Sequence, residues 1–131
     1  MVKGNITPDC LTLVRVHRTD LFADVLGERG KRRGMIERTM KLMTESEEPG
    51  VIVLLHSFRP NVFAERLGAK SLETADPGRP LREYGIGAEI LRELGVRRMV
   101  YISDMQPTRV AGLDGYGLSI EGWRPIKEDK T

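Results

Sequence analysis

The chain has 131 residues, a length typical of one domain, and its 31% charged and 40% hydrophobic residues are typical of a soluble globular protein. A formal net charge of +2 is too small to indicate nucleic-acid or membrane binding, so we expect partners of neither class. The single cysteine, Cys10, excludes an internal disulfide and a zinc site built from several cysteines. The longest apolar run, 51–55, is too short to cross a bilayer, and no export signal is visible, which favours a cytoplasmic protein.

The first half of the chain predicts two strands and one helix. Aliphatic and β-branched residues predict a strand over 11–17, and three glycines with a basic run predict a loop over 20–34. Apolar residues at helical spacing predict a helix from 35 to about 47, which Pro49-Gly50 ends. Its core face is expected to carry three methionines, Met35, Met40 and Met43. The apolar run 51–55 predicts a central strand covered on both faces.

The second half contains the clearest helix of the chain, over 81–94. Pro80 suits the first helical position, and Gly95 suits the position just beyond the last turn. The remaining predictions are short helices near 60–67 and 107–113, a polar loop over 68–79, and strands at 98–103 and 117–121. Alternating strands and helices indicate an α/β layered sheet, whose site is expected at the carboxyl ends of the strands.

Three segments resemble, in the same order, segments of the GTP cyclohydrolase II family of riboflavin biosynthesis. They are the helix Leu81–Val96, the strand Leu13–His17 followed by Asp24–Gly27, and the stretch Val110–Ile120. The resemblance implies one domain over 1–131, truncated at both ends. It also implies a layered α/β/α sandwich around a mixed sheet, similar to the carboxyl-terminal half of bifunctional 3,4-dihydroxy-2-butanone 4-phosphate synthase/GTP cyclohydrolase II proteins.

The zinc site that the resemblance implies lacks its ligands in this chain. Enzymes of the family open the imidazole ring of GTP with a zinc-activated water and release formate and pyrophosphate, and they bind zinc through three cysteines. Those positions correspond here to Asp20, Lys31 and Arg33. Two cations cannot ligate Zn²⁺ and repel it at close range. We therefore expect no cofactor and a degenerate active site.

Other family site residues are partly retained. The family's Asp-x-Arg before the signature helix is represented by Pro80, Leu81 and Arg82, so the arginine that remains is the one catalytic candidate. The resemblance also leaves four candidates for binding a phosphate or a weakly held GTP: Arg15, His17, Ser103 and Arg109. Two further family motifs are altered, in the segments Arg18-Thr19 and Phe58-Arg59-Pro60.

The favoured hypothesis is a pseudoenzyme with an accessory, assembly or regulatory role in riboflavin biosynthesis. By resemblance we expect a homodimer, and fusion to or association with 3,4-dihydroxy-2-butanone 4-phosphate synthase. Two alternatives stay open: a nucleotide-phosphate hydrolase that uses Arg15, His17, Arg82 and Arg109, and a module that senses a nucleotide or a flavin.

Several other residues have a functional and a purely structural interpretation. The basic residues Arg29, Lys31, Arg32 and Arg33 could bind an anion, although a solvated loop is the simpler interpretation. A different metal site could use His17, Asp20, Asp24 and His56, but no recognised ligand spacing supports it. Cys10 is expected to be a small, partly buried residue, and Trp123 a packed amphipathic one.

Overall fold

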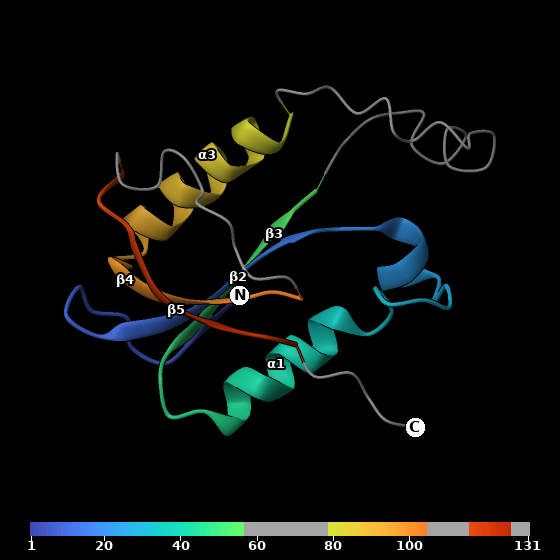
Figure 1. Cartoon of the computed structure of the whole chain (residues 1–131), viewed down its shortest axis with the longest axis horizontal. Helices are drawn as coiled ribbons and strands as arrows, with labels where there is room; N and C mark the ends of the chain where they lie inside the picture. Colours follow the sequence, from blue (N-terminus) through green and yellow to red (C-terminus); the bar gives the residue numbers. More distant parts are fainter. Residues whose placement is uncertain (57–78, 105–115, 127–131) are drawn as a thin grey trace.

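The computed structural model describes residues 1–56, 79–104 and 116–126, with side chains described from residue 85 onward in the second range (Figure 1). The elements are β1 (Val2–Lys3), β2 (Leu11–Arg18), η1 (Leu21–Val25), α1 (Met35–Glu45), β3 (Gly50–Leu55), α3 (Arg79–Glu93), β4 (Arg98–Ile102) and β5 (Ser119–Arg124). The short helices predicted near 60–67 and 107–113 lie outside the described residues, as does nearly all of the loop predicted over 68–79. Among the described helices, none is long and apolar enough to cross a membrane.

The described strands form one mixed sheet in the order β1-β3-β2-β4-β5. The central strand β2 is parallel to both β3 and β4, and β5 is parallel to β4, whereas β1 runs antiparallel to β3. This confirms the α/β class and the mixed sheet. Because four strands run in the same direction, their carboxyl ends meet at one edge of the sheet, where α/β proteins commonly place their sites.

The two helices cover different sets of sheet side chains because successive residues of a strand point to opposite faces. Ala88 and Leu91 of α3 pack with Val14 of β2 and its neighbours. Met35 and Met43 of α1 pack instead with Leu13 and other residues of the opposite set. The helices accordingly lie above and below the sheet in Figure 1. A complete three-layer sandwich stays a prediction, since residues 57–78 and 105–115 lie outside the described residues.

The helix α3 ends as its sequence predicts. Gly95 has a φ of 92°, in the left-handed region that favours glycine. The amide of Gly95 donates to the carbonyl of Arg92 at 3.0 Å, and the amide of Val96 donates to the carbonyl of Leu91 at 3.0 Å. This pair of bonds closes the last turn as a Schellman motif, which satisfies two carbonyls that the helix itself leaves unpaired.

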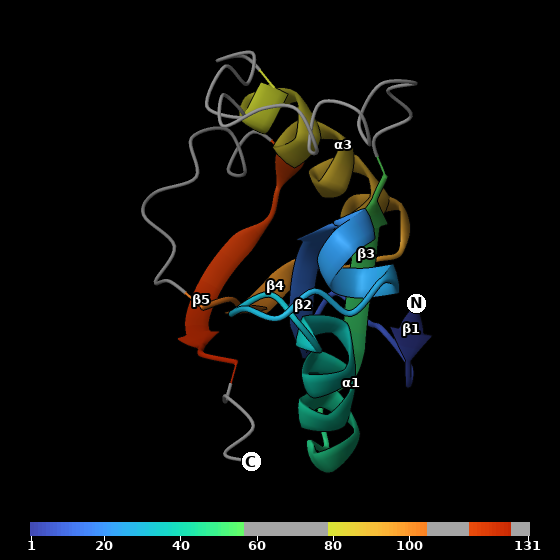
Figure 2. The ribbon, with the colours of Figure 1, turned by 90° about the vertical axis from the view of Figure 1, so that its right-hand side faces the viewer.

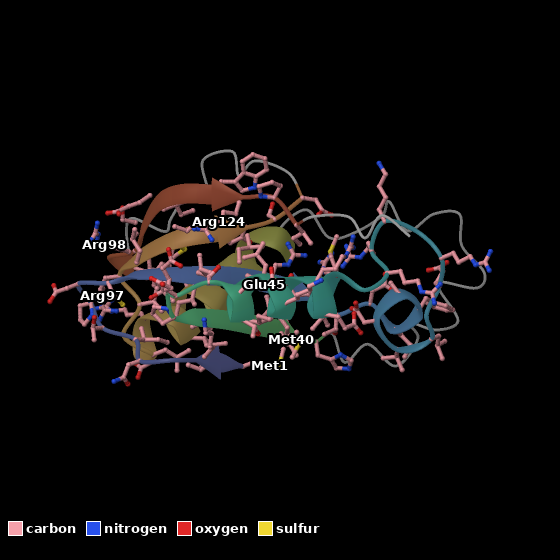
Figure 3. The ribbon with its side chains drawn as sticks, turned by 90° about the horizontal axis from the view of Figure 1, so that it is seen from below. Met1, Met40, Glu45, Arg97, Arg98 and Arg124 are labelled. Carbon is pink, nitrogen blue, oxygen red and sulfur yellow. The ribbon has the colours of Figure 1, made fainter. Side chains whose placement is uncertain are left out.

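Five details differ from the sequence prediction. The central strand is β2 rather than β3, and Leu54 of β3 is 43% exposed, so β3 is not covered on both faces along its whole length. Met40 of α1 is 46% exposed (Figure 3), so only Met35 and Met43 of the three methionines are on the core face. The predicted loop over 20–34 contains the π-helical turn η1, and the last strand covers 119–124 rather than 117–121. The two-residue strand β1 has no sequence signal, because it exists through its pairing with β3.

We predict that Gly95→Ala destabilises the fold by about 1–2 kcal/mol, because an L side chain is strained in the left-handed region. Urea unfolding of the two proteins measures the difference. The matched control is Gly122→Ala, where the new Cβ would meet Val100 at an ordinary 3.6 Å and the backbone is not left-handed. Equal losses of stability in the two variants would contradict this explanation of the helix end.

Candidate functional site

The candidate site begins on the central strand, where alternation places Leu13, Arg15 and His17 on the face that α1 covers. His17 is completely buried. β2 leads directly into η1 at the carboxyl edge of the sheet, and η1 faces the viewer in Figure 2. The strand therefore supplies the site with two basic side chains, one of them without any contact with solvent.

His17 is hydrogen-bonded through both ring nitrogens. Its Nε2 lies 2.9 Å from Oδ2 of Asp24, and its Nδ1 lies 3.2 Å from a guanidinium nitrogen of Arg15. Because a guanidinium only donates, Nδ1 must accept, and the ring proton is on Nε2, which donates to Asp24. Burial lowers the pKa of His17 below its ordinary 6.5, and the hydrogen bond and charge of Asp24 oppose that shift only in part. His17 is thus held as a neutral imidazole.

Asp24 and Asp20 organise the turn that follows the strand. Oδ2 of Asp24 also accepts the amide of Asp20 at 2.7 Å. Oδ1 of Asp20 accepts the amides of Phe22 and Ala23 at 2.9 and 3.1 Å, so Asp20 caps the start of η1. Both carboxylates thereby satisfy amide groups of the turn itself.

Arg15 reaches from β2 across the sheet toward β4 and α1. Its guanidinium donates to the carbonyl of Ile102 at 3.4 Å and to Sδ of Met35 at 3.2 Å. Its Nε is buried and has no hydrogen-bond partner among the described residues. Burial also lowers the pKa of Arg15 from its ordinary value. The side chain is largely enclosed by protein, with long hydrogen bonds.

A second polar pair lies where β2 and β3 end. Oγ of Thr19 donates to the carbonyl of Leu55 at 3.2 Å, and lies 2.8 Å from Nδ1 of His56. His56 is exposed, in contrast to His17. These contacts join the ends of two neighbouring parallel strands.

The other residues predicted from the sequence lie apart from this network or outside the described side chains. Ser103 follows β4, where its amide donates to the carbonyl of Arg124 and its carbonyl accepts the indole N–H of Trp123 at 3.1 Å. Arg82 lies in the first turns of α3, but its side chain is not among those described, and Arg109 falls outside the described residues. Of the five candidates, the structure brings together Arg15 and His17.

The residues that the sequence resemblance aligns with the family's cysteines do not form a cluster of metal ligands. Lys31 and Arg33 are exposed, and the carboxylate of Asp20 caps η1 and lies 3.8 Å from Nε of Arg32. Within the described part of the chain, no group of three or more His, Cys, Asp or Glu side chains is arranged to hold a metal ion. The alternative metal site, which would have used His17, Asp20, Asp24 and His56, is split between two places. His17 pairs with Asp24, whereas His56 lies beside Thr19.

Two sets of contacts at the candidate site were missed from the sequence. The bond between His17 and Asp24 depends on η1 turning the chain back toward β2, and the acid-histidine spacing of seven residues was the available signal. The contacts of Arg32 and Arg38 with backbone carbonyls have no sequence signal beyond the basic run. Cys10 is partly buried and Trp123 is partly buried with its indole N–H bonded, as expected.

Comparison with known proteins identifies the family and several relatives of the chain. A family model described as GTP cyclohydrolase II matches residues 1–125. The chain is 37% identical over 139 residues to the probable bifunctional riboflavin biosynthesis protein RIBA 1, chloroplastic, of Oryza sativa subsp. japonica, covering 96% of this chain and 26% of that protein. It is 36% identical over 142 residues to the riboflavin biosynthesis protein RibBA of Chlorobium phaeovibrioides, covering 96% and 33% respectively.

A third relative carries a different name. The 3,4-dihydroxy-2-butanone 4-phosphate synthase of Photobacterium phosphoreum is 34% identical over 122 residues, which cover 90% of this chain and 32% of that protein. The chain therefore spans about a quarter to a third of the length of the curated relatives it matches.

We predict that the stability of the fold decreases as the pH falls below 6.5. The folded protein holds His17 neutral, with a pKa below 6.5, whereas the unfolded chain takes up a proton near 6.5. Between these two values the unfolded state binds more protons, so the free energy of unfolding falls by up to about 1.4 kcal/mol per pH unit. Urea unfolding between pH 8 and pH 5 measures this slope.

The control variants separate the buried histidine from the exposed one. His17→Gln should lower stability at pH 8 and remove the part of the slope that begins at pH 6.5, whereas His56→Gln should keep the slope. An unchanged slope in His17→Gln would mean that other groups cause the pH dependence.

Proposed function

The chain belongs to the GTP cyclohydrolase II family, and from that membership we propose that it serves riboflavin biosynthesis without catalysing zinc-dependent GTP hydrolysis. Its role in this proposal is accessory: assembly, stability or regulation of a riboflavin-pathway protein. The observation that carries the proposal is the chemistry at the family's three cysteine positions, which hold Asp20, Lys31 and Arg33.

These three residues do not fit a catalytic zinc ion. A catalytic zinc needs three neutral-nitrogen, thiolate or carboxylate ligands and one open position for water. Lys31 and Arg33 offer no lone pair in their charged forms, so two of the three ligands are lost. The remaining carboxylate, of Asp20, already accepts two backbone amides and lies beside Arg32. No step of the family's reaction can therefore be assigned to a metal at these positions.

The acidic group that the family uses for acid–base catalysis is also replaced. The acidic residue of the family's Asp-x-Arg is replaced by Pro80, which has no proton to exchange and lies in the first turn of α3. Proline is well tolerated there, so the replacement preserves the helix. His17 cannot substitute as a general base, because both its ring nitrogens are engaged and its side chain is buried.

The contacts that hold the fold together, in contrast, are present. The network of Arg15, His17 and Asp24 holds the turn η1 against β2, and the signature helix α3 packs on the core. A folded domain without the reactive groups is suited to contact a partner. Two relatives that the chain matches are named as bifunctional or as the 3,4-dihydroxy-2-butanone 4-phosphate synthase, which supports fusion to or association with that activity. Self-association as a homodimer stays a prediction from the family.

Metal analysis and a turnover assay test this proposal together. We predict that the purified chain contains substoichiometric zinc, and that it releases no formate from GTP above the uncatalysed rate, with or without added Zn²⁺. A zinc-loaded GTP cyclohydrolase II assayed in parallel is the positive control. One zinc per chain, or formate release that a chelator abolishes, would overturn the proposal.

A further inference from the structure

The segment between η1 and α1, residues 27–34, is called the basic loop here because it carries Arg29, Lys31, Arg32 and Arg33. We propose that the guanidinium groups of Arg38 and Arg32 cross-link the basic loop to the rest of the domain, in place of a bound zinc ion. This inference rests on the proposed loss of zinc, and it assigns to two arginines the structural part of the metal's role.

Arg38 lies in the first turns of α1 and binds the backbone of the basic loop that precedes it. Its Nη2 donates to the carbonyl oxygens of Lys31 and Arg33, at 3.1 and 3.0 Å, and its Nε donates to the carbonyl oxygen of Gly34 at 3.2 Å. One planar guanidinium thus serves three carbonyls, which a lysine ammonium on a flexible stem would hold less precisely. The end of the loop is fixed to the helix.

Arg32 connects the same loop to the end of the central strand. Its Nη2 donates to the carbonyl oxygen of Arg18, the last residue of β2, at 3.0 Å. Its Nε lies 3.8 Å from Oδ2 of Asp20, the residue that caps η1. The loop therefore contacts the end of β2 and the start of η1, the two elements that come immediately before it in the chain.

These contacts involve the three positions that correspond to the family's cysteines. Arg38 binds the carbonyls of Lys31 and Arg33, and Arg32 lies beside the carboxylate of Asp20. A zinc ion held by three thiolates would join the same three positions, and such a metal contributes its binding free energy to folding. Hydrogen bonds from two arginines close the same stretch of chain without a metal.

The basic loop needs such restraints because its three glycines give its backbone unusual conformational freedom. Gly27, Gly30 and Gly34 all have positive φ angles, of 72°, 153° and 70°. Glycines lose more conformational freedom on ordering than other residues. The ion pair with Asp20 is half exposed on its arginine side, so by itself it adds little. Four hydrogen bonds from charged guanidinium groups to carbonyls, three of them exposed and one partly buried, act on the same short loop and together supply the main restraint.

Hydrogen exchange of the whole chain, followed by mass spectrometry, tests the proposal. We predict that Arg38→Ala and Arg32→Ala each accelerate exchange of amides in residues 19–34 by about tenfold, whereas amides of β2 and β3 keep their protection. Exchange of the same amides in the wild-type protein should not change with a metal chelator or with added Zn²⁺. Arg38→Lys, which keeps the charge but not the planar fork, should also exchange faster than the wild type.

The matched control is Arg29→Ala, since Arg29 is an exposed arginine of the same loop that makes no hydrogen bond or ion pair in the described part of the chain. It should exchange as the wild type does. Wild-type exchange in Arg38→Ala or in Arg38→Lys, equal acceleration in Arg29→Ala, or acceleration of the wild type by a chelator would each overturn the proposal. Turnover of GTP would overturn the proposed function and leave these exchange rates as they are, so the two failures are distinguishable.

Discussion

Both ring nitrogens of a buried histidine are hydrogen-bonded at the end of the central strand, and the arrangement of the site depends on that constraint. His17 donates to Asp24 and accepts from Arg15, so it can be buried without an unsatisfied polar atom. Asp24 in turn holds the amide of Asp20 and thereby the start of η1. Arg15 extends the network to the carbonyl of Ile102 on β4. One imidazole thus connects two strands and the following turn.

Under the proposed function, that constraint would let the domain keep its family's fold without the family's zinc ligands. The packing of α3 does not involve the positions aligned with the family's cysteines, and the network meets one of them, position 20, through its backbone amide, which any residue except proline supplies. Replacing the side chains at these positions therefore removes no core contact. What a zinc ion would contribute to the basic loop is a cross-link, and Arg32 and Arg38 make hydrogen bonds in that region instead. Under the proposed function, replacements at exposed positions would remove the reaction from an intact scaffold, and that scaffold could still serve an accessory role.

The elements that could be predicted from the sequence are those whose signal is local. The β2 strand and the helices α1 and α3 follow from periodicity, and the end of α3 follows from Gly95. The two-residue strand β1 and the turn η1 could not be predicted, because one depends on pairing with a distant strand and the other on a side-chain cap by Asp20. In the site, the predicted strand β2 was enough to place Arg15 and His17 on the same face of the sheet. Their partners Asp24, Met35 and Ile102 come from three other segments, which periodicity cannot bring together.

The proposed function requires that the scaffold around the positions aligned with the family's cysteines is retained while the metal ligands are replaced. The most direct measurement is Co²⁺ binding by the triple variant Asp20→Cys/Lys31→Cys/Arg33→Cys, followed by the thiolate-to-metal absorption and by metal analysis after removal of free ion. From the proposed function we expect the triple variant to take up one metal ion per chain and the wild-type chain none. Binding by the wild-type chain, or a folded triple variant that takes up no metal, would contradict it.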